Sequence, residues 1–435
     1  MINIGIVGSG IAGLYLALYL QRNGHRVTIF EAEDRVGGRI FTHWFDENVY
    51  FEAGAMRIPR SKLHARVYHF IRYLNVNGRQ DDKIELIPYI QENHNNASFI
   101  HNAKSDIDNP ELSSRLKIPL PPRYQGKPAR DLLGEVIRPW LALLQKDFDF
   151  GFAQISQYDA ISFRAYLHLI TGWPHEVIDF VELMTSQTNQ FDLSFIEIIM
   201  QNLDFNTQNW ATTKGGMSRL VRSAVQLVGF ENIHINARVH KIIERQDGRV
   251  TLQTTGTHGG TFDKVILAIP PAALHRIHER PTYMHFEPLA TDLRFRWVVY
   301  PSNDLGSPSA GVLLLYYCWM NDAYRMQSIP RDQRISLALH DLQRFYDTVD
   351  VCDQYVDAFD VCWSQEYATE DAMFLPGQFT RFHQAAKQPE GNIHFAGEHL
   401  SRHHTWIAGA IDSAIQVVMQ IQGEKDVPGV LCLKT

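Results

Sequence analysis

The chain has 435 residues, of which 45% are hydrophobic and 20% charged, and its formal net charge is -7 at pH 7. This length suits two or three domains, and the composition is that of a globular protein with a large core. Because the chain is acidic and has no dense cluster of lysine and arginine, we expect no face that binds nucleic acid. No apolar run reaches the roughly 18 residues that a membrane span needs.

Four cysteines without C-x-x-C or metal-ligand spacing favour buried thiols in a reduced compartment, and we expect the protein to be cytoplasmic. A strand predicted from residue 2 leaves no room for a signal peptide. A peroxisomal location, or export after processing, stays open as an alternative.

The first forty residues predict a strand, a helix and a second strand, at residues 2–7, 11–23 and 26–30. The first strand is apolar, as expected of a buried parallel strand. Between it and the helix the sequence reads G-x-G-x-x-G. In this context the motif indicates a dinucleotide-binding Rossmann unit.

The three glycines of the motif have different predicted roles. Gly8 permits the tight turn, Gly10 lets a pyrophosphate approach the backbone, and Gly13 lets the helix pack closely on the strand. The free amides at the start of the helix then face the phosphates. Glu31, at the end of the second strand, is placed to accept hydrogen bonds from an adenosine ribose.

The next motif distinguishes between dinucleotides. Arg35, Gly38 and Arg39 belong to an R-x-G-G-R run that resembles FAD-binding flavoproteins of the glutathione-reductase and amine-oxidase kind. The glycine pair lets a loop run beside the pyrophosphate, and Arg39 supplies charge and a fork of donors. The alternative is a glycine turn with a solvated arginine. We expect the cofactor to be FAD.

Residues 54–59 read G-A-M-R-I-P, which resembles the flavin-contacting segment of L-amino acid oxidases in the flavin amine oxidase superfamily. The resemblance implies that small residues at Gly54 and Ala55 let the backbone lie against the flavin ring, and that Ala55 and Met56 bind the cofactor. It also implies that Arg57 contacts the cofactor and holds the substrate carboxylate. The alternative interpretation is a structural ion pair between Arg57 and an acid such as Glu52.

Later segments extend the resemblance along the chain. Alternating helical patterns beyond residue 131 predict a helical insertion, which in the family roofs the cavity. Residues 185–191 resemble fungal members, but their residue types indicate no chemical role. A G-G-M run at 215–217 precedes a β-meander that would cover the adenine, with Val239 against it.

Tyr300 precedes a proline in an aromatic, strand-like stretch, and the resemblance implies that its hydroxyl binds the substrate carboxylate. The alternative is a strand tyrosine bonded to water. Between the motifs, local patterns predict helices over 61–74 and 332–345, a loop over 91–110, a buried strand over 311–320, and a strand and loop over 363–379 that line the cavity.

The C-terminal part contains F-A-G-E, the run that closes the FAD domain in this superfamily. The resemblance implies that Gly397 and Glu398 meet the ribityl and pyrophosphate region. Trp406, Ile407 and Ala410 open the last helix, whose positive end would favour the reduced flavin. Trp406 also resembles the aromatic wall beside the substrate, and with Arg57 and Tyr300 it completes the predicted catalytic set.

Some positions depart from the family pattern or indicate no site. Relatives have a lysine that holds a water near flavin N5, yet no lysine occurs between Lys264 and Lys387. Thr405 stands where relatives often have glycine. His403 and His404 are adjacent and should point apart, so we predict no metal site.

The predicted fold class is α/β, with a Rossmann-type, glutathione-reductase-like FAD-binding domain, a mixed-sheet substrate domain and a helical insertion. The predicted divisions are 1–75, 209–271 and 388–435 for the FAD-binding domain, 76–104 and 272–387 for the substrate domain, and 105–208 for the helical domain.

The resemblance implies flavin-dependent oxidation of L-amino acids by dioxygen to 2-oxo acids, with release of ammonia and hydrogen peroxide. One alternative is a monoamine or polyamine oxidase, although Arg57 would repel an amine. The other is a catalytically impaired FAD-binding protein, because the lysine segment is missing. A homodimer is left open.

Overall fold

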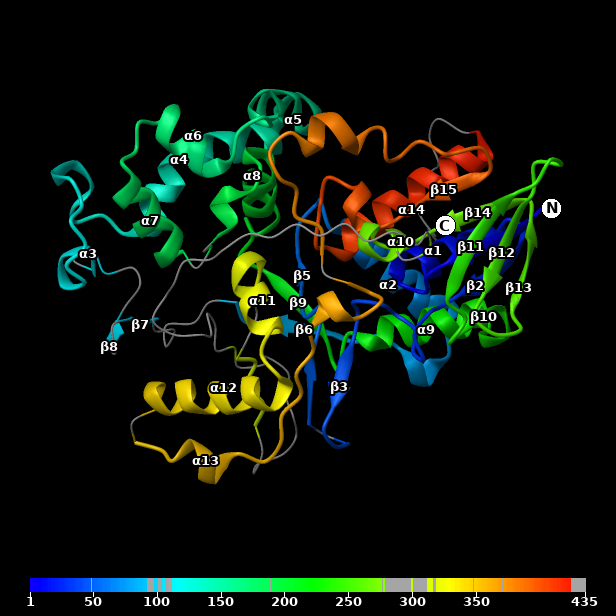
Figure 1. The fold of residues 1–435 in the computed structure, drawn as a ribbon, viewed down its shortest axis with the longest axis horizontal. Helices are drawn as coiled ribbons and strands as arrows, with labels where there is room; N and C mark the ends of the chain where they lie inside the picture. Colours follow the sequence, from blue (N-terminus) through cyan, green and yellow to red (C-terminus); the bar gives the residue numbers. More distant parts are fainter. Residues whose placement is uncertain are drawn as a thin grey trace.

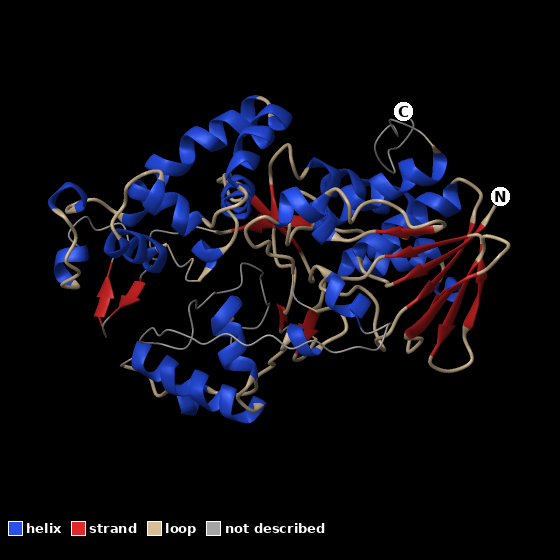
Figure 2. Cartoon of the chain, turned by 45° about the horizontal axis from the view of Figure 1, so that its top comes forward, coloured by secondary structure: helices blue, strands red, loops and turns tan. Residues whose placement is uncertain are grey.

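The structure is a computed structural model of the chain. It describes residues 1–47, 49–91, 98–100, 103–105, 109, 112–185, 187, 189–275, 277, 299, 311–315, 318–346, 348–369 and 371–423. Figure 1 and Figure 2 show the longer strands gathered at one end of the molecule, while a group of helices occupies the other end.

A five-stranded parallel sheet forms the centre of the cofactor-binding part, in the order β10-β2-β1-β14-β15. The first strand pairs with both β2 and β14, which places the glycine turn that follows it in the middle of the sheet edge. This arrangement confirms the predicted Rossmann-type sheet. The strands are β1 (Asn3–Val7), β2 (Arg26–Phe30), β10 (Ile233–His234), β14 (Lys264–Leu267) and β15 (Ile393–Phe395).

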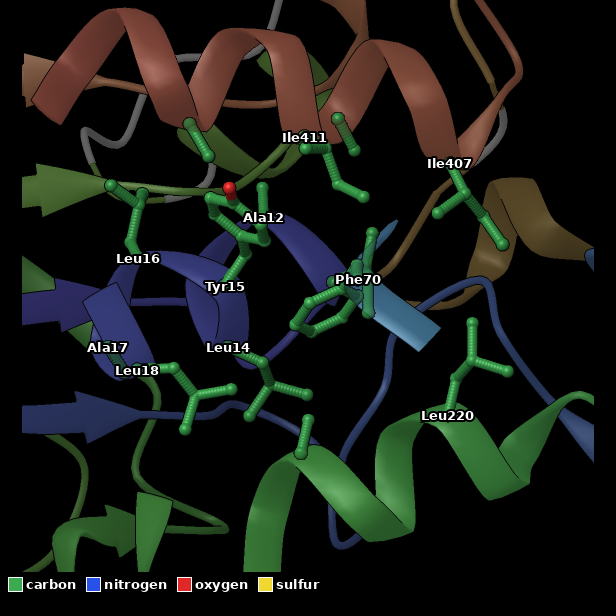
Figure 3. Packing of buried hydrophobic residues seen from close by; sticks show 14 of the residues in the cluster. Ala12, Leu14, Tyr15, Leu16, Ala17, Leu18, Phe70, Leu220, Ile407 and Ile411 are labelled. Carbon is green, nitrogen blue, oxygen red and sulfur yellow. The ribbon is translucent and has the colours of Figure 1, made fainter. Parts of the chain in front are cut away.

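Helices cover one face of this sheet, and α1 lies at their centre. Figure 3 shows α1 between two helices, with Ile411 on one side and Leu220 on the other. Tyr15 is fully buried there, and its ring centre lies 5.2 Å from that of Phe70. The helices are α1 (Ile11–Arg22), α2 (Ala65–Asn77), α9 (Ser218–Val228) and α14 (Ile407–Gln422).

The other face carries a three-stranded antiparallel meander. Phe262 of the meander packs edge-on against Phe30 of the central sheet, with ring centres 5.8 Å apart. The strands are β11 (Val239–Glu244), β12 (Val250–Thr254) and β13 (Gly259–Phe262). The third strand includes the pair Gly259 and Gly260. Glycine is depleted in strands, so local composition does not indicate this strand.

A small antiparallel sheet joins three distant segments beside the cofactor-binding part, in the order β5-β9-β6. Trp210 on β9 lies between Pro59 on one side and Tyr89 on the other. This register carries the segment around Arg57 next to two aromatic residues. The strands are β5 (Ile58–Pro59), β6 (Leu86–Tyr89) and β9 (Trp210–Thr213).

Two further strand pairs lie outside these sheets. One pairs β3 (Thr42–Trp44) with β4 (Tyr50–Glu52), and the other pairs β7 (Ser98–Ile100) with β8 (Ala103–Ser105). The second pair corrects the loop predicted over 91–110. Its two three-residue strands are too short to show a hydrophobic period.

The helical insertion is confirmed. Its own core is buried between amphipathic helices whose apolar faces meet. The helices of the insertion are α4 (Ala129–Lys146), α5 (Phe148–Ile155), α6 (Phe163–Leu169), α7 (His175–Met184) and α8 (Phe195–Asp204). The remaining α-helices of the described chain are α3 (Leu112–Arg115), α10 (Pro271–His275), α11 (Met320–Gln327), α12 (Arg331–Phe345) and α13 (Val351–Gln354).

Two predicted strands are wrong. Within 311–320, the described residues form only one isolated bridge, between Val299 and Leu314, and α11 begins at Met320. An apolar run without period does not identify a strand by itself. Within 363–379, the described residues form short turns and loop, although they do line the central cavity as predicted. In the described part of the chain, no helix combines the length and the apolar character needed to cross a membrane.

The packing of α1 on β1 generates a prediction. A Cβ at position 13 would lie 2.1 Å from the Gly8 carbonyl oxygen, whereas one at position 10 would meet nothing within 4 Å. We therefore expect Gly13→Ala to lower the free energy of unfolding by about 1–3 kcal/mol, the usual effect of overpacking. Gly10→Ala should leave it within about 0.5 kcal/mol, since Gly10 has a φ of -62° that alanine adopts readily.

Urea unfolding without added ligand, followed by circular dichroism, measures both variants. Equal stabilities for Gly13→Ala and Gly10→Ala would contradict the role assigned to the close contact.

Candidate active site

A continuous cavity of about 3200 Å³ runs from the glycine turn to the helical insertion. It is larger than the roughly 300–1,000 Å³ pockets that hold drug-sized ligands. Most of the predicted cofactor residues line it: Gly8, Gly10, Glu31, Gly38, Arg39, Ala55, Met56, Arg57, Val239, Gly397, Glu398, Trp406, Ile407 and Ala410. Gly13 and Arg35 are not among the residues that line the cavity.

The glycine turn forms an open cradle at one end of the cavity. Gly8 has a φ of 100°, and a Cβ there would lie 2.6 Å from the Ala268 carbonyl oxygen. Gly10 borders the cavity with free space on its Cβ side, directly before the first turn of α1. A phosphate at this place would meet the unpaired backbone amides of a helix start.

Glu31 is fixed at the carboxyl end of β2. One carboxylate oxygen accepts hydrogen bonds from the Ser9 backbone N–H at 2.8 Å and from the Ser9 hydroxyl at 2.6 Å. The other accepts from the Glu33 N–H at 2.9 Å. Each oxygen has two lone pairs, so the oxygen bonded to Ser9 is fully used and the other retains capacity for a ribose hydroxyl.

Arg35 has a place different from the one expected for a cofactor ligand. Its guanidinium donates to the Gly38 carbonyl at 2.8 Å and pairs with Glu33 at 2.9 Å. It also lies over the Phe41 ring, with Cζ 4.3 Å from the ring centre. These contacts brace the R-x-G-G-R loop, and the role of Arg35 in cofactor binding stays a prediction.

Arg39 and Glu398 form an ion pair on the cavity wall, with Nη1 and Oε1 2.8 Å apart. The Glu398 carboxylate also accepts from the backbone N–H groups of Ala372 at 3.1 Å and Thr405 at 2.9 Å. Burial alone would raise the pKa of Glu398, but Arg39, with smaller help from His404, holds it at about 2. Glu398 is therefore a fixed negative charge.

Arg57 lies half-buried on the cavity wall inside a cage of aromatic rings. Its Cζ is 5.2 Å from the ring centre of Phe205, 5.6 Å from that of Trp210 and 5.7 Å from that of Tyr89. Its Nη1 also approaches the Tyr89 hydroxyl at 3.4 Å. No acid of the described chain forms an ion pair with it. The cage stabilises the cation by cation–π attraction and leaves most of its N–H donors free.

The alternative of an ion pair between Arg57 and Glu52 is wrong. Glu52 accepts hydrogen bonds from the Met217 N–H at 2.8 Å and the Thr42 hydroxyl at 2.9 Å. Burial raises the pKa of Glu52 to about 7, so this carboxyl is not a strong counter-ion at neutral pH.

Trp406 completes the aromatic wall at the start of α14. Its ring centre lies 5.4 Å from Phe205, 6.0 Å from Trp210 and 5.1 Å from His64. Burial lowers the pKa of His64 to about 4, so the imidazole beside Trp406 is neutral at pH 7. The structure thus brings Arg57 and Trp406 to the same set of rings, while Tyr300 lies outside the described residues.

Comparison with known families decides the identity of this site. The model of flavin-containing amine oxidoreductases matches residues 11–296 and 284–422, nearly the whole chain. The chain belongs to this family. Its cofactor is FAD, and the cavity fits it: an open glycine cradle, a buried acid at the ribose position and a cation beside them.

Individual relatives agree with this assignment. The chain is 28% identical to a putative bifunctional amine oxidase of Dictyostelium discoideum, covering 97% of this chain but only 46% of that protein. It is 27% identical to the L-amino-acid oxidase of Naja atra, covering 98% of this chain and 89% of the other. Among solved structures, a double mutant of putrescine oxidase matches with a TM-score of 0.73 over 97% of this chain and 99% of the other, at 18% identity, which shows the fold.

The loop before α14 of this flavoprotein contains two buried ion pairs that sequence analysis missed. His403 bonds to Asp204 through Nδ1 at 2.9 Å, and His404 bonds to Glu197 through Nδ1 at 2.8 Å. Both acids lie on α8, seven residues apart and therefore on one helix face. Two acids within the apolar pattern of α8 were the available signal. The histidines point apart as expected, and no metal-binding group of three such side chains occurs among the described residues.

Thr405, between this loop and Trp406, has a φ of 71°. Left-handed backbone is rare for a β-branched residue and costs about 1–3 kcal/mol. This geometry explains why relatives can use glycine here. The hydrogen bond from the Thr405 N–H to Glu398 holds the conformation.

The His403–Asp204 pair generates a prediction about pH. Burial by itself would lower the pKa of His403, but Asp204 raises it above 6.5. Stabilisation by the pair is therefore full below pH 6.5 and is lost as the pH rises through the folded-state pKa of His403. We expect Asp204→Asn to reduce the free energy of unfolding by roughly 3–5 kcal/mol below pH 6.5. The deficit should shrink at higher pH.

Urea unfolding of both proteins between pH 5.5 and 8.5 measures this difference. A deficit that does not change with pH would show that Asp204 acts through packing alone.

Proposed function

We propose that this flavoprotein oxidises L-amino acids to 2-oxo acids, with release of ammonia and hydrogen peroxide. One observation carries the proposal: Arg57 is a half-buried cation on the cavity wall, and no acid of the described chain neutralises it. A guanidinium matches a carboxylate bidentately. The substrate carboxylate would supply the missing negative charge.

Electrostatics separate this substrate class from simple amines. Two like charges 4 Å apart repel by about 4 kcal/mol at an effective dielectric constant of 20, and opposite charges attract by the same amount. A protonated amine near Arg57 would therefore bind weakly. An α-amino acid places its own carboxylate between the cation and the amino group, which removes this repulsion.

The side chains around Arg57 would position the substrate. When bound, FAD supplies the hydride acceptor and passes the electrons to dioxygen. Arg57 would hold the carboxylate so that the Cα–H bond has one orientation, and Trp406 and Phe205 would pack against the substrate and exclude water. Loss of the Cα hydride from the form with an unprotonated amino group leaves an imino acid, which water converts to a 2-oxo acid and ammonia. Fixed orientation is the main catalytic contribution of the protein.

One observation favours a second function, that of a flavin-binding protein without turnover. The sequence has no lysine between Lys264 and Lys387, where relatives have the lysine that holds a water near flavin N5. Turnover measurements on the FAD-loaded protein distinguish the two functions directly.

The test is peroxide release by the FAD-loaded protein with a panel of L-amino acids and with simple amines such as putrescine. We expect turnover of amino acids and little turnover of amines. Arg57→Ala should lower kcat/KM for amino acids by about 10–100-fold, the value of one charged hydrogen bond. Arg57→Lys should restore part of it.

Arg60→Ala is the matched control. Arg60 is an exposed arginine three residues along the chain, stacked on Tyr68 and absent from the cavity wall. Its removal should leave kcat/KM within about twofold, as for other surface substitutions. Turnover of amines that survives Arg57→Ala would refute the proposal, and bound flavin without any turnover would favour the second function.

A further inference from the structure

The turn between α7 and α8 presents two glutamines to the cavity. Gln187 and Gln190 both line the cavity, together with Thr185 at the end of α7. They belong to the run 185–191, for which the sequence indicated no role. Neither glutamine belongs to the predicted cofactor-binding residues or to the cage around Arg57.

The side chain of Gln187 lacks a hydrogen bond that buried amide atoms normally have. The Gln187 Oε1 atom has no solvent contact and no hydrogen-bond partner. Gln190 is only 6% exposed. A buried amide facing a cavity without a partner is a candidate for binding a polar ligand group.

The turn is held rigidly from behind. The Glu182 carboxylate accepts from the Phe191 N–H at 3.0 Å, and the Glu182 carbonyl accepts from the Gln187 N–H at 3.0 Å. Arg164 forms an ion pair with Glu182 and a second one with Asp192 at 3.0 Å. The acids of this region are therefore occupied, and the two glutamine side chains are left on a fixed backbone.

Two further glutamines of the cavity wall lie close in sequence to residues of the cage around Arg57. Gln201 lines the cavity on α8, one helical turn before Phe205, whose ring contacts Arg57. Gln91 follows Tyr89 by two residues, and its Oε1 is also buried without a partner. We refer to Gln91, Gln187, Gln190 and Gln201 as the glutamine set.

Among the described residues of the helical insertion that line the cavity, no charged side chain is buried. Arg130, Asp131 and Arg138 of α4 also line the cavity, but all three are exposed. Solvent therefore screens their charges. An ionised substrate side chain among the amides would be buried without a counter-ion, and an aliphatic one would leave the amides unpaired.

We propose, on the basis of the function proposed above, that the glutamine set binds the substrate side chain and favours a carboxamide. L-glutamine is then a preferred substrate. A carboxamide both donates and accepts, as the glutamines do, so it pairs with them in either orientation of their amides. Arg57 would hold the carboxylate at one end of the same molecule.

The test compares kcat/KM of the FAD-loaded protein for L-glutamine, L-glutamate and L-methionine. Glutamate has the shape of glutamine with a charge, and methionine has a similar length without the amide. We expect glutamine to exceed both by about tenfold or more, since a site built to hydrogen-bond a group rejects analogues that lack it. Similar values for all three substrates would overturn the inference and leave the proposed function intact.

Two substitutions test whether Gln187 contributes to this preference. Gln187→Met, which keeps the side-chain length, should lower the ratio of kcat/KM for glutamine over methionine by about fivefold or more, with flavin absorption unchanged. Gln157→Leu is the control, because Gln157 is exposed on the helical insertion and absent from the cavity wall. An unchanged ratio in Gln187→Met would overturn the role of this residue.

Failure of the proposed function can be distinguished from failure of this inference. If no amino acid releases peroxide, the change in flavin absorption on titration with each amino acid measures binding instead. Tighter binding of glutamine than of methionine would support the role proposed for the glutamine set, and equal binding would overturn that role.

Discussion

The ion pair between Arg39 and Glu398 is the constraint on which the cofactor end of the cavity depends. It joins residues 359 positions apart, at the point where the R-x-G-G-R loop meets the loop before α14. A carboxylate as buried as Glu398 is tolerated only when a cation and hydrogen-bond donors surround it. The same carboxylate fixes Thr405 in left-handed backbone. The position of Trp406, the next residue, therefore follows from an electrostatic contact.

The helical insertion is attached by the same principle. Asp204 and Glu197 present two acids from one face of α8, and His403 and His404 meet them from the loop before α14. Each partner alone would be a buried charge or an unpaired polar group, so the pairs give α8 one position against the cofactor loop. Phe205, directly after Asp204, is thereby held beside Arg57. The aromatic cage consequently depends on contacts that lie behind it.

The sequence predicted what is local. The strand, turn and helix around Gly10 have fixed spacing, and the helices of the insertion have a clear period, so both appear where expected. The partners of His403 and His404 lie about 200 residues away on α8, and no local pattern encodes such a contact. The strand predicted over 311–320 is wrong for another reason. Its residues are uniformly apolar, and a position in a cavity wall and a position in a buried strand give the same composition.

Charge pairing within the structure distinguishes Arg57 from the other buried ionic groups of the site. Glu398 has Arg39, and the two acids of α8 have histidines, as buried charges generally require. Arg57 has aromatic rings instead, which stabilise a cation, and among the described residues it has one weak hydrogen bond, to Tyr89, and no carboxylate partner. For folding alone, an apolar side chain of similar size would fill the same cage with less loss of hydration. Under the proposed function, the substrate carboxylate supplies the anion that this guanidinium lacks.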